Sequence, residues 1–125
     1  MLATTKVLLV EDESELRELY TELLSIEYAV DVAKDGEEGI EMLPRGKYDV
    51  VLLDMMMPKL DGVGFLTRKK DMPDVISVPV IVMSNLRQDE VVKICFELGA
   101  KYYIQKADIT PDKIISIIAE IISKK

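Results

Sequence analysis

Acidic, hydroxyl and ammonium side chains follow four short apolar runs of this 125-residue chain. Glu11 and Asp12 come directly after the run KVLLV, and Asp54 ends VVLLD. Ser84 ends PVIVMS, and Lys106 follows KYYIQ. Ionised groups are seldom buried without a partner, so a buried strand that ends on an acid needs either a surface turn or a neutralising ligand. These side chains are the candidates for chemistry if the fold brings them together.

Three carboxylates in one place repel one another, and a divalent cation removes that penalty. The chain has no histidine, which excludes Ser-His-Asp and Cys-His catalysis and His-based metal sites. Mg²⁺ takes oxygen ligands and is often shared with a phosphate group. A phosphoryl group needs cations and hydrogen-bond donors around its oxygens, which Lys106 and Ser84 offer. The residue types therefore predict a Mg²⁺-dependent phosphoryl site with Asp54 as the acceptor.

Apolar runs alternate with amphipathic segments along the whole chain. Short apolar runs rich in β-branched residues predict buried strands, and apolar stripes at a spacing of three and four predict helices. Asp12 or Ser14 is the expected cap of the first helix, and Pro44-Arg45-Gly46 predicts a turn after the second. The predicted strands cover residues 6–10, 28–33, 48–53, 79–84 and 101–105, and the predicted helices cover 16–24, 36–42, 62–70, 88–98 and 111–125.

Five such β–α units predict an α/β fold, a three-layer sandwich with a parallel sheet between helices. With five strands, the flavodoxin-like order 2-1-3-4-5 is expected, and ligands of such sheets bind at the carboxyl ends of the strands. In that order the first and fourth strands both lie next to the third. Glu11, Asp12, Asp54 and Ser84 then share one edge. The length predicts a single domain over 1–125, without an output domain.

Composition excludes several classes of partner. The net charge of −7 argues against nucleic acids and anionic membranes, which attract basic surfaces. No apolar run approaches the ~20 residues of a membrane helix, and the N-terminus lacks the features of a secretory signal. The single Cys95 cannot form an internal disulfide, which agrees with a reducing compartment. We therefore expect a cytoplasmic protein.

The segments VEDE, LLDMMMPKLDG, VMSN and YYIQK together resemble the signature set of response regulator receiver domains. Order and spacing match over nearly the whole chain. The resemblance implies a signalling module of a two-component system or phosphorelay rather than an enzyme. Asp54 would accept a phosphoryl group from a histidine kinase or histidine phosphotransfer protein. The phosphorylated protein, a monomer or phosphorylation-dependent dimer, would then bind a downstream protein.

The resemblance also implies a role for each site residue. The cofactor that the resemblance implies is Mg²⁺, with Mn²⁺ or Ca²⁺ as substitutes. The switch would reshape the face formed by residues 88–98, 101–105 and 111–125. By similarity, Asp54 is the phosphoacceptor, and Ser84 and Lys106 bind the phosphoryl oxygens. Asp12 would be a direct metal ligand, Glu11 a ligand through water, and Met56 a ligand through its backbone carbonyl. Ser84 would also be a switch residue, together with Tyr103 as the aromatic switch residue.

Two other functions and one departure from the family pattern bear on this interpretation. A phosphatase or phosphotransferase of the haloacid dehalogenase type would use Asp54 as nucleophile. The motif of that class is Asp-x-Asp. In this chain Met56 stands at the position of the second aspartate, so the general acid is missing. A flavodoxin-like cofactor carrier would need a phosphate-binding loop where EDESE has the wrong charge. Receiver domains usually have proline after the lysine. Here Ala107 favours a trans bond, since a non-proline cis bond costs about 3–4 kcal/mol.

Overall fold

The structure is a computed structural model that describes residues 4–85 and 88–124. Strands and helices alternate along the described residues, as the sequence predicts. A short 3-10 turn, η1, precedes the last helix. The elements are β1 Lys6–Val10, α1 Ser14–Leu24, β2 Ala29–Ala33, α2 Gly36–Gly46, β3 Val50–Asp54, α3 Gly62–Lys70, β4 Val80–Ser84, α4 Asp89–Glu97, β5 Tyr102–Gln105, η1 Lys106–Asp108 and α5 Pro111–Ser123.

The strands form one parallel sheet in the order β2-β1-β3-β4-β5, which confirms the predicted fold class. β1 and β3 are neighbours, with Val10 opposite Leu53. β3 and β4 are neighbours too, with Asp54 opposite Met83. The strands therefore end together, and the segments that follow β1, β3, β4 and β5 meet at one edge of the sheet.

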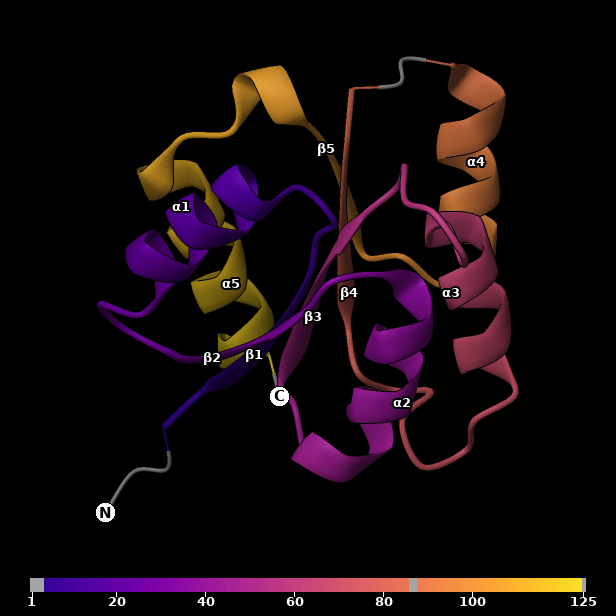
Figure 1. The fold of residues 1–125 in the computed structure, drawn as a ribbon, viewed down its shortest axis with the longest axis horizontal. Coiled ribbons are helices and arrows are strands. Elements are labelled where there is room, and N and C mark those ends of the chain that lie inside the picture. Colours follow the sequence, from indigo (N-terminus) through magenta and orange to yellow (C-terminus); the bar gives the residue numbers. More distant parts are fainter. Residues whose placement is uncertain (1–3, 86–87, 125) are drawn as a thin grey trace.

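Helices cover both faces of the sheet (Figure 1), with α1 and α5 on one side and α2, α3 and α4 on the other. Each side has its own apolar core. The first is built around Leu9, Leu52 and Ile118, and the second around Leu53 and Phe65. Residues 50–54 of β3 are all buried because the strand lies in the middle of the sheet, covered from both sides. No helix within the described ranges is long and apolar enough to cross a membrane.

Two local predictions are wrong. Pro44-Arg45-Gly46 is the last part of α2 rather than a turn. Leu43 is fully buried in the core beneath this helix, so packing outweighs the helix-breaking tendency of Pro44. The helix ends at Gly46, and the next residue, Lys47, adopts a left-handed conformation. The N-cap of α1 is Glu13, which makes no side-chain capping bond, rather than Asp12 or Ser14.

Three other helices begin at capping residues of the types that the sequence offers there. Asp35 accepts a hydrogen bond from the Glu38 amide at the start of α2 (2.9 Å), and Asp61 accepts one from the Gly64 amide at the start of α3 (2.8 Å). Thr110 caps α5 through the Lys113 amide. These caps fix where each loop enters its helix. The cap at Asp61 matters most for the site, because it closes the loop that follows β3.

Lys69 is a buried lysine on α3 that the sequence pattern does not reveal. The residue is 6% exposed, and its Nζ donates a hydrogen bond to the Ile76 carbonyl oxygen (2.8 Å) in the segment before β4. Burial lowers the pKa of the Lys69 ammonium from 10.5 to about 8. The charged amine is thus unfavourable in the folded state, and the hydrogen bond compensates only part of its desolvation.

We expect the stability of the protein to rise with pH relative to a Lys69→Met variant. The unfolded chain keeps the amine proton up to about pH 10.5, whereas the folded chain releases it near pH 8, so the unfolded state binds more protons between these values. Over this window the wild-type protein should gain about 1–2 kcal/mol of unfolding free energy against the variant. Urea unfolding as a function of pH measures the difference. The matched control is Lys70→Met, which removes an exposed neighbouring charge. A difference in unfolding free energy between the wild type and Lys69→Met that does not change with pH would contradict the prediction.

Candidate functional site

Three carboxylates meet at the carboxyl ends of β1 and β3. One carboxylate oxygen from each of Glu11, Asp12 and Asp54 lies within 4.8 Å of the others. Glu11 is 0% exposed and Asp54 2% exposed, whereas Asp12 is partly exposed. They come together because β1 pairs with β3, so that acids 43 positions apart in the sequence end neighbouring strands. The predicted acidic cluster is therefore present.

Lys106 bridges the two buried acids. Its Nζ lies 3.0 Å from Glu11 Oε1 and 3.1 Å from Asp54 Oδ1. Lys106 begins η1 directly after β5, and its side chain is 11% exposed. No peptide bond between described residues is cis, so the Lys106–Ala107 bond is trans, as expected from alanine at position 107. The trans peptide does not keep the ammonium away from Asp54.

The electrostatics of the site follow from burial and from the sharing of one ammonium by two acids. Burial and the nearby charge of Glu11 raise the pKa of Asp54 from 3.8 to about 7, although the positive charge of Lys106 acts in the opposite direction. Burial disfavours the charge on Lys106, but its bond to Glu11 and the charge of Asp54 outweigh this and raise the pKa of Lys106. The lysine stays protonated, and the site holds more negative charge than it can neutralise.

The loop between β3 and α3 brings Met56 beside Asp54. The Met56 amide donates a long hydrogen bond to Asp54 Oδ1 (3.4 Å), and the Gly62 amide donates to the Met55 carbonyl oxygen (2.9 Å). Met55 packs in the core, while Met56 is 61% exposed. Gly62 is required here because a Cβ at this position would lie 2.9 Å from the Met55 Cα. The loop thus holds the Met56 backbone at the mouth of the site.

A pocket of about 270 Å³ opens at this mouth. Asp54 and Lys106 both line it, so a small molecule could reach them from solvent. Its size suits a small polar group rather than a large cofactor. The lining residues are Glu13, Asp54, Met56, Asn85 and Lys106.

The two predicted switch residues lie on neighbouring strands. Ser84 ends β4, next to β3, and is 1% exposed. Tyr103 is partly buried on β5 and packs on the side of the sheet that α2, α3 and α4 cover. Ser84 is therefore at the edge that carries the acids. Tyr103 lies further back along β5, three residues before Lys106.

Three residues at the site were not assigned a role from the sequence: Glu13, Arg17 and Asn85. Glu13 and Asn85 line the pocket, and the Glu13 amide donates a hydrogen bond to Glu11 Oε2 (3.2 Å). Arg17 Nη1 donates to the carbonyl oxygens of Glu11 (2.9 Å) and Asp12 (3.2 Å). The one signal in the sequence is the position of Arg17 in the first turns of the helix that follows the acids.

The donor set fits a divalent cation. Carboxylate oxygens are the ligands that Mg²⁺ prefers, and the three present are close enough to share one ion. Burial and the charge of Glu11 raise the pKa of Asp54 in spite of the Lys106 ammonium, so this one cation does not fully compensate the ionised acid. A bound cation would compensate the remaining charge. The residues that would hold it are Glu11, Asp12 and Asp54, and the Met56 backbone lies beside Asp54.

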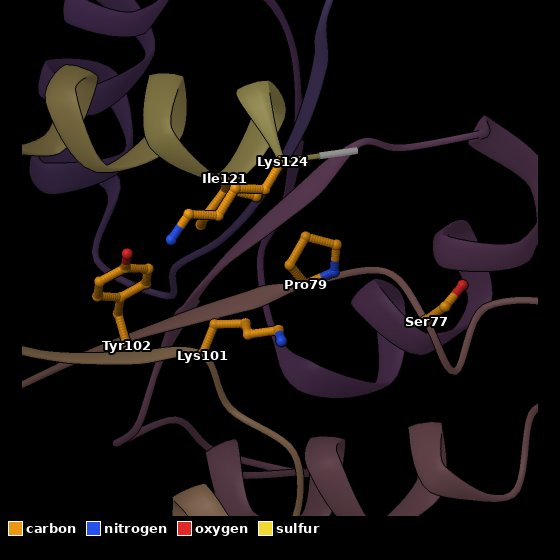
Figure 2. Close-up of a pocket in the computed structure, with 6 residues that line it drawn as sticks. All are labelled: Ser77, Pro79, Lys101, Tyr102, Ile121 and Lys124. Atoms are coloured by element: carbon orange, nitrogen blue, oxygen red, sulfur yellow. The ribbon is translucent and has the colours of Figure 1, made fainter.

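A second pocket, of about 240 Å³, lies at the opposite edge of the sheet (Figure 2). Pro79 and Lys101 immediately precede β4 and β5, so this pocket is at the amino ends of the strands. Figure 2 shows Lys124, directly after α5, reaching toward Tyr102, and the Lys124 ammonium pairs with Glu120 (3.0 Å). None of the residues predicted to do chemistry lines it. The candidate site is therefore the pocket at the carboxyl edge.

Known proteins resemble this chain in sequence and fold. The chain is 37% identical over 102 residues to the transcriptional regulatory protein DltR of Streptococcus agalactiae, covering 81% of this chain and 45% of DltR. It is 41% identical over 104 residues to the probable transcriptional regulator ycf27 of Guillardia theta, covering 81% and 39%. The chain thus spans less than half the length of these curated relatives.

Solved structures of receiver domains have the same fold as this chain. A receiver domain protein from Clostridium thermocellum superposes with a TM-score of 0.87 at 27% identity, covering 96% of this chain and 95% of that one. The receiver domain of the sensor histidine kinase PA1611 from Pseudomonas aeruginosa, solved with magnesium in its active-site cleft, gives 0.87 at 24%, covering 97% and 99%. The family profile described as "Response regulator receiver domain" matches residues 7–119. The chain therefore belongs to the family of response regulator receiver domains.

Proposed function

We propose that this chain is a phosphoacceptor switch in which Asp54 takes a phosphoryl group from a phosphohistidine donor in the presence of Mg²⁺. One observation carries the proposal. Asp54 is buried at the carboxyl edge of the sheet, within 3.1 Å of the Lys106 ammonium and beside two further acids, yet it borders an open pocket. A mere turn residue would not need this surplus of buried charge.

The geometry supports direct transfer to the carboxylate. Asp54 attacks the phosphorus atom, a new O–P bond forms, and the N–P bond of the phosphohistidine breaks, with its electron pair leaving on the imidazole nitrogen. Lys106 remains a cation because its pKa is raised, so it can pair with a phosphoryl oxygen. The Ser84 hydroxyl can bond another. Bound Mg²⁺ would supply the remaining charge neutralisation, and the P. aeruginosa receiver domain holds magnesium in its own active-site cleft.

Phosphorylation would act as a switch through its added charge. An aspartyl phosphate brings extra negative charge and additional acceptor oxygens to the end of β3. Ser84 would move toward these oxygens, and Tyr103 would turn inward into the space beneath α4. The face formed by α4, β5 and α5 would change shape as a shift between two packings.

The proposed partners follow from this chemistry. A histidine kinase or histidine phosphotransfer protein would supply the phosphoryl group, since the chain contains no histidine of its own. The output would be binding to a downstream protein, or dimer formation, through the changed face. Residues 1–125 would act as one receiver unit in the cytoplasm, and the net charge of −7 disfavours direct binding to nucleic acids or membranes.

Incubation of the protein with an acyl phosphate and Mg²⁺ tests the proposal. We expect one phosphoryl group per chain, mapped to Asp54 by peptide mass analysis after borohydride trapping. Chelation of Mg²⁺ should abolish the modification, because without the cation the acids repel an incoming phosphate. Modification at another residue, or modification that does not need a divalent cation, would contradict the proposal. Continuous hydrolysis of phosphate monoesters would instead indicate a haloacid dehalogenase-type enzyme.

A further inference from the structure

Arg17 reaches back from the first turns of α1 to the segment that joins β1 to α1. Its Nη1 donates to the carbonyl oxygens of both Glu11 (2.9 Å) and Asp12 (3.2 Å). Its own carbonyl oxygen accepts a hydrogen bond from Thr21 Oγ1 (2.6 Å) one turn further along the helix. A guanidinium presents its donors in a rigid planar group, so one side chain can fix two successive peptide groups.

This segment needs such support because α1 starts without a side-chain cap. Glu13 occupies the N-cap position and makes no capping bond through its side chain. The Glu11 amide is held by the Ala33 carbonyl of β2 (3.1 Å), so the chain is anchored where β1 ends. Asp12 follows that anchor, is partly exposed, and has its carbonyl oxygen held by Arg17.

We propose that Arg17 is a positioning residue for the metal site, acting through the backbone of Glu11 and Asp12. By holding both carbonyl oxygens it would fix the direction in which the Asp12 carboxylate faces Asp54. The separation of at most 4.8 Å among the three acids would then be set before the cation arrives. The inference rests on the proposed function, since it concerns the affinity of this site for Mg²⁺.

The charge of Arg17 and its hydrogen bonds have opposite effects on a bound cation. A guanidinium near the acids repels Mg²⁺, so removal of the charge alone would strengthen binding. Loss of the two hydrogen bonds frees the segment and weakens binding, as does the loss of other groups that orient metal ligands. A neutral substitution of Arg17 therefore distinguishes the two roles. Tighter binding of Mg²⁺ would indicate the effect of the charge, and weaker binding would indicate the loss of the hydrogen bonds.

The experiment is an NMR titration of backbone amides with Mg²⁺ in wild-type, Arg17→Met and Arg17→Gln proteins. At about 0.5 M KCl the Debye length falls to about 4 Å, which screens the charge effect. We expect both variants to bind Mg²⁺ about 10-fold more weakly than the wild type. The titration reports on folded molecules, so a loss of stability alone would not change the affinity. Arg17→Gln gives the result if Arg17→Met does not fold.

The matched control is Arg68→Met, which removes an exposed arginine on α3 and should leave the affinity for Mg²⁺ unchanged. Wild-type affinity or tighter binding in the Arg17 variants, with normal binding in the wild type, would overturn the proposal for Arg17. Absence of Mg²⁺ binding in the wild-type protein would instead overturn the proposed function, and with it the inference that depends on it.

Discussion

Replacement of Asp54 by asparagine should abolish phosphorylation and, in metal-free buffer above pH 7, stabilise the protein by about 2–3 kcal/mol. The first effect follows because the amide has no anionic oxygen to attack phosphorus. The second follows because Asp54 is buried next to Glu11, and the single ammonium of Lys106 lies within 3.1 Å of both acids. An ionised carboxylate at this position should therefore make the folded protein less stable than a neutral side chain would.

The stabilisation should depend on pH in a defined direction. Asp54 has a pKa of about 7 in the folded chain and 3.8 in the unfolded chain, so the folded state binds more protons between these values. The wild-type protein therefore loses stability relative to Asp54→Asn as the pH rises from about 4 to about 7, and the difference is constant above that. Urea unfolding in EDTA at several pH values measures it.

Asp74→Asn is the matched control, since it removes an exposed aspartate outside the site. It should change stability by no more than about 0.5 kcal/mol. Addition of Mg²⁺ should narrow the gap between wild type and Asp54→Asn, because a ligand present at 100 times its Kd stabilises the binding-competent protein by about 2.7 kcal/mol. If Asp54→Asn is less stable than the wild type above pH 7, the site does not hold more negative charge than Lys106 neutralises, and the prediction is wrong.

Replacement of Lys106 by methionine should have the opposite effect on stability and slow phosphorylation about 100-fold. The ammonium contacts both Glu11 and Asp54, so its loss leaves two buried acids without a cation. Removal of one partner from a buried ion pair typically costs about 3–5 kcal/mol, and we expect about 3 kcal/mol here in metal-free buffer. Protonation of Asp54 relieves part of the repulsion at neutral pH.

This relief gives the Lys106→Met variant its own dependence on pH. The charge of Lys106 lowers the pKa of Asp54 in the wild type, so in the variant that pKa rises above 7. The destabilisation should therefore grow as the pH rises and Asp54 ionises. Denaturant unfolding and the rate of acyl phosphate incorporation measure the two effects. Lys113→Met, at an exposed position of α5, is the control, and a normal rate in Lys106→Met would show that this lysine does not assist transfer.

The elements that position the site were largely predictable from the sequence. Buried strands such as VVLLD are continuous apolar runs, and α5 repeats isoleucine at helical spacing, so local pattern and burial agree there. Prediction failed at Pro44, where the buried Leu43 keeps the helix going despite the proline. It also missed Lys69, because the type of a residue does not reveal which side of α3 the tertiary packing covers.

By itself, the sequence determined the alternation of strands and helices, and with it the placement of Glu11, Asp12, Asp54 and Lys106 after strands. These features depend on neighbouring residues and on general rules for parallel sheets. Only the tertiary structure decided that Lys106 bridges two acids, that Asp54 has a pKa of about 7 and that Arg17 holds the β1–α1 segment. Such properties depend on distances of a few ångströms and on burial. For Lys106 and Asp54 these are set by how distant segments pack together, and for Arg17 by how the helix is oriented relative to the segment before it.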